Sequence, residues 1–392
     1  MSEKYLGEGI GKLGFGYMRL PRKDGAFDHE SVNEMVDEFL ASGFSYFDTS
    51  YIYEGSEEAL NKSLVKRYPR DSFQITTRVA IMIGPRTREN LQMQLDTSLK
   101  RLGVDYVDNY MMHALGDGTV ELADTLDAWG FLRGVKEKGL AKHIGFSYHG
   151  TPETLDKILT DHPEVEIVQL QINYLDWENP EVQSRRLYEI VRKHNKPFTI
   201  MEPTKGGLLA GGESNAAEFL KKANPDASVA SWAFRYVGGL EGLVTALSGM
   251  ENIDHIRDNA NTFKNFKPLS DEEHEIIKQA VEIINSTPRV PCTTCNYCVP
   301  HCPMKIRIPT FIEIYNKFLV HGNRNSSGYT YASMTRFGSG PSKCTKCKAC
   351  EEHCPQRIEI SEVMGKVAEE LEGTIENFII RTDTSEQNFQ RG

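Results

Sequence analysis

Short runs of β-branched and aromatic residues alternate with segments of helical period along the first two thirds of the chain. Eight runs are typical of strands: 13–18, 44–49, 73–79, 106–113, 143–147, 167–173, 198–202 and 243–248. Helical patterns follow them at 29–42, 54–67, 87–102, 119–138, 152–161, 181–194, 227–237 and 252–264. Strand and helix alternating eight times predict a parallel sheet, and right-handed crossovers of this number close most economically into a (β/α)8 TIM barrel.

An open doubly wound sheet is the alternative to the barrel. Such a sheet normally carries a three-glycine fingerprint after its first strand. The pair Gly14 and Gly16 lacks the third glycine at the right offset and a following helix. We therefore interpret these glycines as part of a turn.

The cysteines mark a second region. All eight lie between Cys292 and Cys354, after an amphipathic pattern at 271–284 and a polar stretch with two prolines at 285–291. We predict a barrel domain over residues 1–285 and a small second domain over residues 286–392. Helical patterns at 308–320 and 360–371 indicate that this domain is mainly α-helical.

The spacing C-x2-C-x2-C-x3-C-P occurs twice within this region. Three cysteines of such a motif ligate one 4Fe-4S cluster, and the fourth ligates the other cluster. We predict two 4Fe-4S clusters with crossed ligands: Cys292, Cys295, Cys298 and Cys354 for one, Cys344, Cys347, Cys350 and Cys302 for the other. Zinc and disulfides are disfavoured, because zinc ribbons pair two cysteines per limb and the N-terminus lacks a secretion signal.

Net charge and hydropathy exclude some classes of binding partner. The chain has 45 basic and 55 acidic residues, a net charge of −10, which gives no support for a nucleic-acid surface. The most apolar stretch, 236–250, is too short to span a bilayer. We expect a cytoplasmic protein with no membrane or nucleic-acid partner. Basic residues surround the cysteine motifs, where they would offset the negative charge of the thiolate-bound clusters, steer an acidic electron carrier, or simply form a solvated face: Lys305, Arg307, Lys343, Lys346, Lys348 and Arg357.

Three polar residues fall at the ends of predicted barrel strands, where catalysis in such barrels takes place. Asp48 and Tyr53 follow the second strand, and His113 ends the fourth. A tyrosine can donate a proton and a histidine can hydrogen-bond a substrate oxygen, which suits carbonyl reduction. Taken singly, each is more often a packed residue.

Together these features resemble the aldo/keto reductase family, and specifically its branch with a C-terminal 4Fe-4S ferredoxin-like domain. The resemblance rests on segments in one order: 47–53, 55–57, 105–113, 142–147, 169–173, 202–208 and 248–259. It implies a catalytic tetrad of Asp, Tyr, Lys and His, with Asp48, Tyr53 and His113 in three of the positions. Arg78 stands where the family has the lysine.

Arg78 leaves two interpretations open. A guanidinium is planar, permanently charged and suited to bidentate carboxylate pairing. Arg78 either bridges Asp48 and Tyr53, so that its charge makes the phenol a better acid, or forms a structural ion pair with Asp48.

The resemblance also implies a nicotinamide cofactor, NAD(H) or NADP(H), across the barrel mouth. Ser147 and Gln169 stand at the carboxamide positions and Met201 at the ring-stacking position, which Tyr148 would otherwise fill. Phosphate contacts are expected at glycine turns and a helix N-terminus: Lys205, Gly206, Ser248, Gly249 and Asn259. His255 replaces the usual 2′-phosphate arginine, with Lys205 and Arg257 as nearby compensating charges, so NADH should bind no worse than NADPH.

Two functions remain. The first is an oxidoreductase that reduces a carbonyl or related unsaturated small-molecule substrate, with Tyr53 as proton donor and electrons from the nicotinamide, the clusters or both. The second is an electron-transfer subunit whose barrel is a docking scaffold for a flavoprotein or ferredoxin partner. Arg78 and the altered nicotinamide positions favour the second function, and the tetrad residues favour the first.

Overall fold

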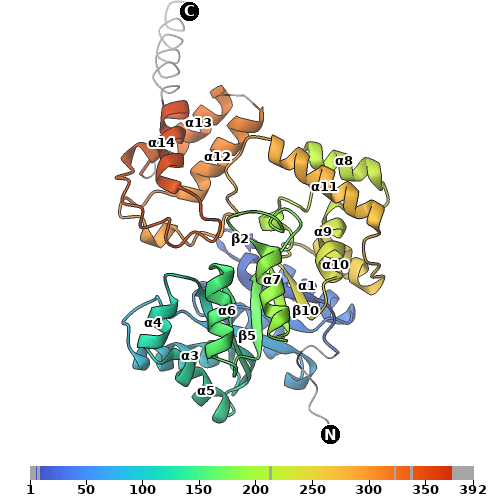
Figure 1. Cartoon of the computed structure of the whole chain (residues 1–392), viewed down its shortest axis with the longest axis vertical. Coiled ribbons are helices and arrows are strands. Elements are labelled where there is room, and N and C mark those ends of the chain that lie inside the picture. Colours follow the sequence, from blue (N-terminus) through green and yellow to red (C-terminus); the bar gives the residue numbers. More distant parts are fainter. Residues whose placement is uncertain (1–5, 7–8, 212–213, 322–323, 336–338, 373–392) are drawn as a thin grey trace, which may run out of the picture. The chain divides into compact units, whose positions relative to one another are not determined.

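A computed structural model describes residues 6, 9–211, 214–321, 324–335 and 339–372 (Figure 1). The chain divides after Val281 into two compact units. This division lies within helix α11 (Asp271–Ser286). The sequence placed the domain boundary after residue 285, one residue before the end of the same helix.

Eight parallel strands form a closed barrel in the first unit (Figure 1). Their order around the barrel is β1-β10-β9-β8-β7-β6-β5-β4, and β4 pairs with β1 to close it. The predicted (β/α)8 barrel is therefore confirmed, and the open sheet was the wrong alternative. The strands are β1 (Leu13–Gly16), β4 (Tyr46–Asp48), β5 (Gln74–Val79), β6 (Val107–Leu115), β7 (Ala141–Tyr148), β8 (Ile167–Gln171), β9 (Phe198–Met201) and β10 (Leu243–Ser248), with a small hairpin of β2 (Arg22–Lys23) and β3 (Ala26–Phe27) outside the barrel.

Helices follow the barrel strands, and several begin at a side-chain cap. Asp28, Thr87, Thr151 and Asn252 each accept a hydrogen bond from the backbone N–H three residues ahead, which satisfies a free donor of the first turn. The helices are α1 (His29–Ala41), α2 (Ser56–Leu60), α3 (Arg88–Leu102), α4 (Val120–Thr125), α5 (Ala128–Glu137), α6 (Pro152–Asp161), α7 (Ser184–Lys193), α8 (Asn215–Ala223), α9 (Val229–Gly238) and α10 (Ile253–Lys264).

The segment 119–138 forms two helices where the sequence predicted one. Asp127 adopts a left-handed conformation with φ of 48°, and its side chain caps α5 through the Gly130 N–H. This conformation interrupts the helical hydrogen bonds, so α4 ends at Thr125 and α5 begins after the Asp127 cap. In the segment 54–67, α2 is continued by the π-helical turn η2 (Asn61–Val65).

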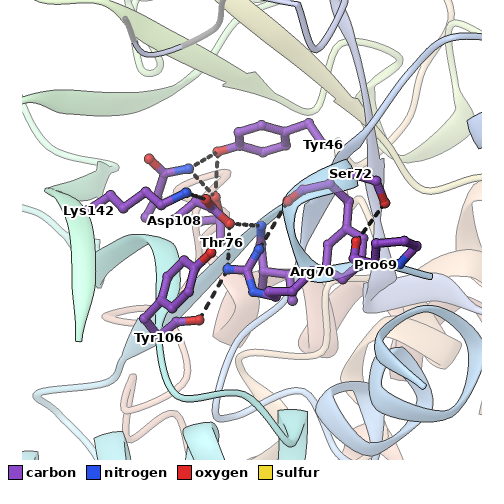
Figure 2. Close-up of polar contacts among 11 residues, drawn as sticks. Tyr46, Pro69, Arg70, Ser72, Thr76, Tyr106, Asp108 and Lys142 are labelled. Carbon is purple, nitrogen blue, oxygen red and sulfur yellow. Dashed lines mark hydrogen bonds and ion pairs between the residues drawn. The ribbon is translucent and has the colours of Figure 1, made fainter. Parts of the chain in front are cut away.

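The N-terminal ends of β5, β6 and β7 are joined by a polar network around the buried carboxylate of Asp108 (Figure 2). Asp108 accepts from Arg70 Nη2 at 2.7 Å, from the Ile75 N–H at 2.9 Å and from Lys142 Nζ at 2.8 Å. One carboxylate therefore connects three strands, which holds this end of the sheet in register.

Helices dominate the second unit, as predicted. They are α12 (Ile308–His321), α13 (Arg324–Thr335) and α14 (Ile360–Leu371), with short 3-10 turns η5 (Val299–His301) and η6 (Pro341–Lys343) beside the cysteines. Ile308, Phe311, Met364 and Val367 form a separate apolar core. Within the described ranges, no helix is both long and apolar enough to cross a membrane.

Candidate functional site

Asp48 and Arg78 form a buried ion pair at the C-terminal ends of β4 and β5. Arg78 Nη1 donates to Asp48 Oδ1 at 2.9 Å and Nη2 to Oδ2 at 2.6 Å, while the arginine is 1% exposed. Its remaining donors reach the Thr49 carbonyl at 2.5 Å and Gln169 Oε1 at 2.8 Å. Burial acts to lower the pKa of Arg78, but the Asp48 carboxylate raises this pKa above its usual value. The guanidinium is therefore a fixed positive charge.

Tyr53 and His113 lie together beside this charge. Their rings meet edge to face with centroids 5.7 Å apart. The phenol of Tyr53 also interacts electrostatically with Arg78. The structure thus brings all four residues of the predicted catalytic set to one place, and the Asp48–Arg78 pair is compatible with both interpretations of Arg78.

The surroundings of His113 favour its neutral form. It is 3% exposed, and burial lowers its pKa well below the usual range, with the charge of Arg78 and the neighbouring His149 acting in the same direction. Its Nδ1 lies 2.7 Å from Ser50 Oγ. The sequence placed Ser50 inside a motif but gave no sign of this contact, which depends on how the turn after β4 folds back toward β6.

Ser147 and Gln169, the predicted carboxamide residues, are register partners on β7 and β8. Ser147 Oγ accepts from the Ala114 N–H at 2.8 Å. Gln169 gives its oxygen to Arg78, and its buried Nε2 makes no short hydrogen bond to the described residues. The Gln169 side chain does act on the neighbouring Asp48 carboxylate, whose pKa it tends to lower, so this amide N–H faces Asp48 and has room for a ligand oxygen.

The stacking position is held by Met201, the last residue of β9. Tyr148, the substitute that the sequence suggested, is tied elsewhere. Its hydroxyl donates to the Thr151 carbonyl at 2.7 Å, and its ring packs on Phe146. A thioether is soft and adaptable, so Met201 remains the side chain suited to cover a flat ring.

The predicted phosphate residues occupy two neighbouring turns. After β9, Gly206 and Gly207 adopt left-handed conformations, but Lys205 Nζ lies 2.5 Å from Asp176 Oδ1, with both side chains buried. After β10, Asn259 Nδ2 donates to Ser248 Oγ at 3.1 Å and fixes the turn that contains Gly249.

The two remaining side chains of the phosphate region lie on α10. Arg257 is exposed and pairs with Glu38 at 3.3 Å. His255 lies in the first turn, where its N–H donates to the Asn252 cap at 2.9 Å and its Nδ1 accepts from the Glu251 N–H at 3.3 Å.

The cysteines line two cavities. Cys292, Cys295, Cys298 and Cys354 line the first, and Cys302, Cys344, Cys347 and Cys350 line the second. These are the two sets that the spacing predicts, each with one cysteine from the opposite motif. Over the described ranges, no group of three or more His, Cys, Asp or Glu side chains is arranged to hold a single metal ion. The four thiols of each set instead line a cavity.

Backbone geometry around the cavities suits a 4Fe-4S cluster. Thr294 and Asn296 in the first motif, and Lys346 and Lys348 in the second, have φ of 54–64°, which curls each loop around its cysteines. The Thr294 N–H donates to Cys292 Sγ at 3.4 Å. Burial raises the pKa of the Cys350 thiol to about 11, so a thiolate there requires a positive partner such as iron. The donor set and the loops fit the group.

A further contact joins the two motifs. His301 and His353 occupy equivalent positions, directly before Cys302 and Cys354, and their rings stack with centroids 3.4 Å apart. The repeated His-Cys-Pro sequence was the available signal for this contact, although spacing alone could not show that the rings meet.

Comparisons with known proteins agree with this geometry. The model of the aldo/keto reductase family matches residues 12–282, and the model of the 4Fe-4S dicluster domain matches residues 291–359. "Probable aldo-keto reductase 1" of Glycine max is 30% identical over 178 residues, which are 43% of this chain and 49% of that protein. Aldo-keto reductase str7 of Strobilurus tenacellus is 30% identical over 222 residues, 54% of this chain and 63% of that protein. The chain thus spans about half to two thirds of these relatives.

Solved structures show the same fold. Aldo-keto reductase AKR11C1 from Bacillus halodurans superposes with a TM-score of 0.57 at 22% identity, covering 71% of this chain and 96% of that one. An aldo-keto reductase from Klebsiella pneumoniae in complex with NADPH gives a TM-score of 0.58 at 20% identity, covering 75% and 99%.

Proposed function

Because the chain belongs to the aldo/keto reductase family and carries a 4Fe-4S dicluster domain, we propose that this oxidoreductase reduces a carbonyl or related unsaturated group of a small molecule, with Tyr53 as the proton donor. The observation that supports this most is the neutral ring of His113 against Tyr53, next to the buried charge of Arg78. We assign this chemistry to a barrel domain of residues 1–285 and the clusters to residues 286–392.

Each polar residue has one role in this proposal. Tyr53 delivers a proton to the substrate oxygen, and the fixed charge of Arg78 favours the phenolate that remains. Asp48 holds the guanidinium in place. We assign Nδ1 of His113 as the acceptor of a hydrogen bond from Ser50 Oγ, 2.7 Å away. In that tautomer the ring proton is on Nε2, where it hydrogen-bonds the substrate oxygen without competing as an acid.

The electrons come from groups that the protein would bind. When bound, a nicotinamide supplies a hydride and the clusters supply single electrons. Gln169 Nε2 is the donor available for the carboxamide, Met201 covers the ring, and the turns after β9 and β10 receive the phosphates. The eight cysteines hold two clusters.

One observation favours the second function, an electron-transfer subunit whose barrel docks a flavoprotein or ferredoxin. Arg78 donates hydrogen bonds to the oxygen of Gln169 and to both oxygens of Asp48. The Asp48 charge is therefore neutralised by a fixed ion pair, and a proton relay does not require so rigid an arrangement. In this function the barrel polar groups are structural, and electrons pass only through the second domain to a ferredoxin or flavoprotein.

The Tyr53→Phe variant separates the two functions. It removes only the hydroxyl, and loss of a general acid costs roughly a hundredfold or more in turnover of carbonyl substrates. The measurement is steady-state reduction of a carbonyl panel by anaerobically purified protein, with reduced ferredoxin oxidation followed in parallel. Unchanged carbonyl turnover together with intact partner-dependent electron transfer would establish the scaffold function.

Iron analysis tests the clusters. Two 4Fe-4S clusters require about eight irons per chain, and each Cys→Ser change should disturb one cluster. Reconstituted protein with about four irons, or with zinc instead, contradicts the assignment.

Cofactor titration tests the nicotinamide site. NADH should bind no worse than NADPH, because the first turn of α10 carries His255 in place of an arginine. A strong preference for NADPH that disappears in His255→Ala would show that the histidine itself recognises the 2′-phosphate, contrary to this expectation.

A further inference from the structure

Arg19 lies between the two turns assigned to phosphates. It ends the 3-10 turn η1 (Tyr17–Arg19) directly after β1. Its Nη1 donates to the Gly206 carbonyl at 3.4 Å, and its aliphatic stem passes over Gly249, where an added Cβ would lie 3.4 Å from Arg19 Cδ. One side chain therefore reaches the turn after β9 and the turn after β10.

The cations that the sequence nominated are placed less well for this role. Lys205 Nζ is buried against Asp176, which also accepts from Gln171 at 2.8 Å and Asn173 at 2.7 Å. Removing Lys205 from this network to meet a phosphate would leave a buried carboxylate without its counter-charge. Arg257 is held by Glu38 and Asp254 on the exposed face of α10.

Glu202 provides the second observation. Its Oε1 lies 3.9 Å from Arg19 Nη2, and its Oε2 is buried with no hydrogen-bond partner among the residues described. Burial raises the pKa of Glu202, while the charges of Arg19 and Lys205 oppose the rise. The carboxyl is therefore poorly solvated and is held by a hydrogen bond from the Gly206 backbone and the long contact with Arg19, in contrast to Asp48, whose two oxygens are bound by Arg78 at 2.6 and 2.9 Å.

We propose that Arg19 binds the diphosphate of the dinucleotide, and that Glu202 is its counter-ion in the ligand-free protein. This inference rests on the proposed nicotinamide site and names a residue for it that no motif identified. A guanidinium fork matches the oxygens of a phosphate, and this side chain lies against Gly206 of one turn and Gly249 of the other. Binding exchanges the long contact with Glu202 for short charge-assisted bonds to phosphate.

The test compares matched arginine variants of the full, cluster-loaded chain. Titration with NADH, followed by competition with ADP, measures the affinity for the diphosphate with and without the nicotinamide. We expect Arg19→Met to raise the Kd of both ligands by roughly 10- to 100-fold, with partial recovery in Arg19→Lys. Arg22→Met is the control, since Arg22 is exposed on the β2–β3 hairpin and its Nη1 binds the Gly25 carbonyl.

Two further measurements sharpen the result. Nicotinamide mononucleotide has one phosphate and no diphosphate, so its Kd should change much less in Arg19→Met. Glu202→Gln removes the counter-charge and should tighten NADH by up to about fivefold. Weakening in Glu202→Gln as large as that in Arg19→Met would overturn the counter-ion role.

The outcomes separate this inference from the proposed function. If the unaltered protein binds no nicotinamide dinucleotide, the nicotinamide part of the proposed function is wrong and the inference falls with it. If the unaltered protein binds NADH and Arg19→Met binds it equally well, with its cluster absorbance and circular dichroism intact, only the role of Arg19 is wrong.

Discussion

An arginine–aspartate pair lies at each end of the barrel, and the two pairs differ in their access to water. At the N-terminal end, Asp108 is shared by Arg70, Lys142 and a backbone N–H, and the side chains of Arg70 and Lys142 are 22% and 54% exposed (Figure 2). At the C-terminal end, Asp48 meets Arg78, which is 1% exposed. Asp108 thus has several partners, two of which reach water, whereas the Asp48 carboxylate has one charged partner that is shielded from water.

This difference separates a stabilising device from a chemical one. Charges near water are screened and contribute modestly, whereas a charge in a low-dielectric interior acts strongly on its neighbours. Arg78 acts on Tyr53, His113 and Tyr46, whereas Arg70 lies over the rings of Tyr106 and Phe73. Under the proposed function, the same two residue types hold strands together at one end and tune proton chemistry at the other.

The largest effect is expected from Arg78→Met, which leaves Asp48 buried without its counter-charge. Loss of one partner of a buried pair costs about 3–5 kcal/mol in the free energy of unfolding. Anaerobic urea unfolding of the cluster-loaded protein measures it, together with depressed carbonyl turnover. In Asp48→Asn/Arg78→Met most of the stability should return, because neither charge remains.

Arg78→Lys is the conservative control for this prediction. It keeps a positive charge beside Tyr53, so carbonyl reduction should be retained or raised. If Arg78→Met loses less than about 1 kcal/mol, the site is more hydrated than the structure indicates, and the contrast between the two ends disappears.

A smaller loss is expected from Arg70→Met at the other end. Asp108 keeps Lys142 and the Ile75 N–H, so the cost is that of hydrogen bonds to a charged group, about 1.5–3 kcal/mol. Carbonyl turnover, measured on the same preparation, should stay within about twofold of the unaltered enzyme, since no reacting group lies near. A large loss of turnover without loss of stability would show that this network acts on the chemistry.

The sequence predicted the strands well because each is a short apolar run bounded by polar turns. The prediction of the helices was less complete. α8 escaped notice, and so did α13, whose sequence Asn-Ser-Ser-Gly-Tyr-Thr-Tyr-Ala-Ser lacks an apolar period. Helix α4 was predicted joined to α5 because a left-handed Asp127 cannot be foreseen from periodicity.

The site was predictable where it depends on strand ends and not where it depends on turns. Barrel geometry places Asp48, Arg78 and His113 at one end once the strands are known. By contrast, Lys205 and Asp176 meet across 29 positions, and Arg19 and Gly206 across 187. Such contacts arise from the packing of turns, which no local pattern encodes.

Acid should destabilise the C-terminal end through His113. Its pKa is lowered in the folded protein by burial, Arg78 and His149, while the unfolded value is about 6.5. As the pH falls below about 6.5, the unfolded chain binds a proton that the folded chain does not. The free energy of unfolding therefore falls by up to about 1.4 kcal/mol per pH unit. The slope is measured by urea unfolding at several pH values, and His113→Asn should reduce it by this amount. An unchanged slope would mean that His113 titrates normally.

The smallest expected loss of stability comes from Tyr46→Phe, and comparison with the same substitution at Tyr53 tests whether the two ends differ. Tyr46 is fully buried between the two pairs, where the charges of Asp48, Arg78 and Asp108 all act on its hydroxyl, and this hydroxyl accepts from Thr76 Oγ1 at 2.6 Å (Figure 2). Tyr46→Phe keeps the ring in the core, and Thr76 still receives a hydrogen bond from Asn109 Nδ2 at 2.9 Å. The loss should therefore be about 1 kcal/mol in the free energy of unfolding, with kcat/KM within about twofold. Tyr53→Phe should do the reverse, with nearly unchanged stability and roughly a hundredfold less turnover. If Tyr46→Phe lowers turnover as much as Tyr53→Phe, the two ends act as one unit and the division between structural and chemical pairs is wrong.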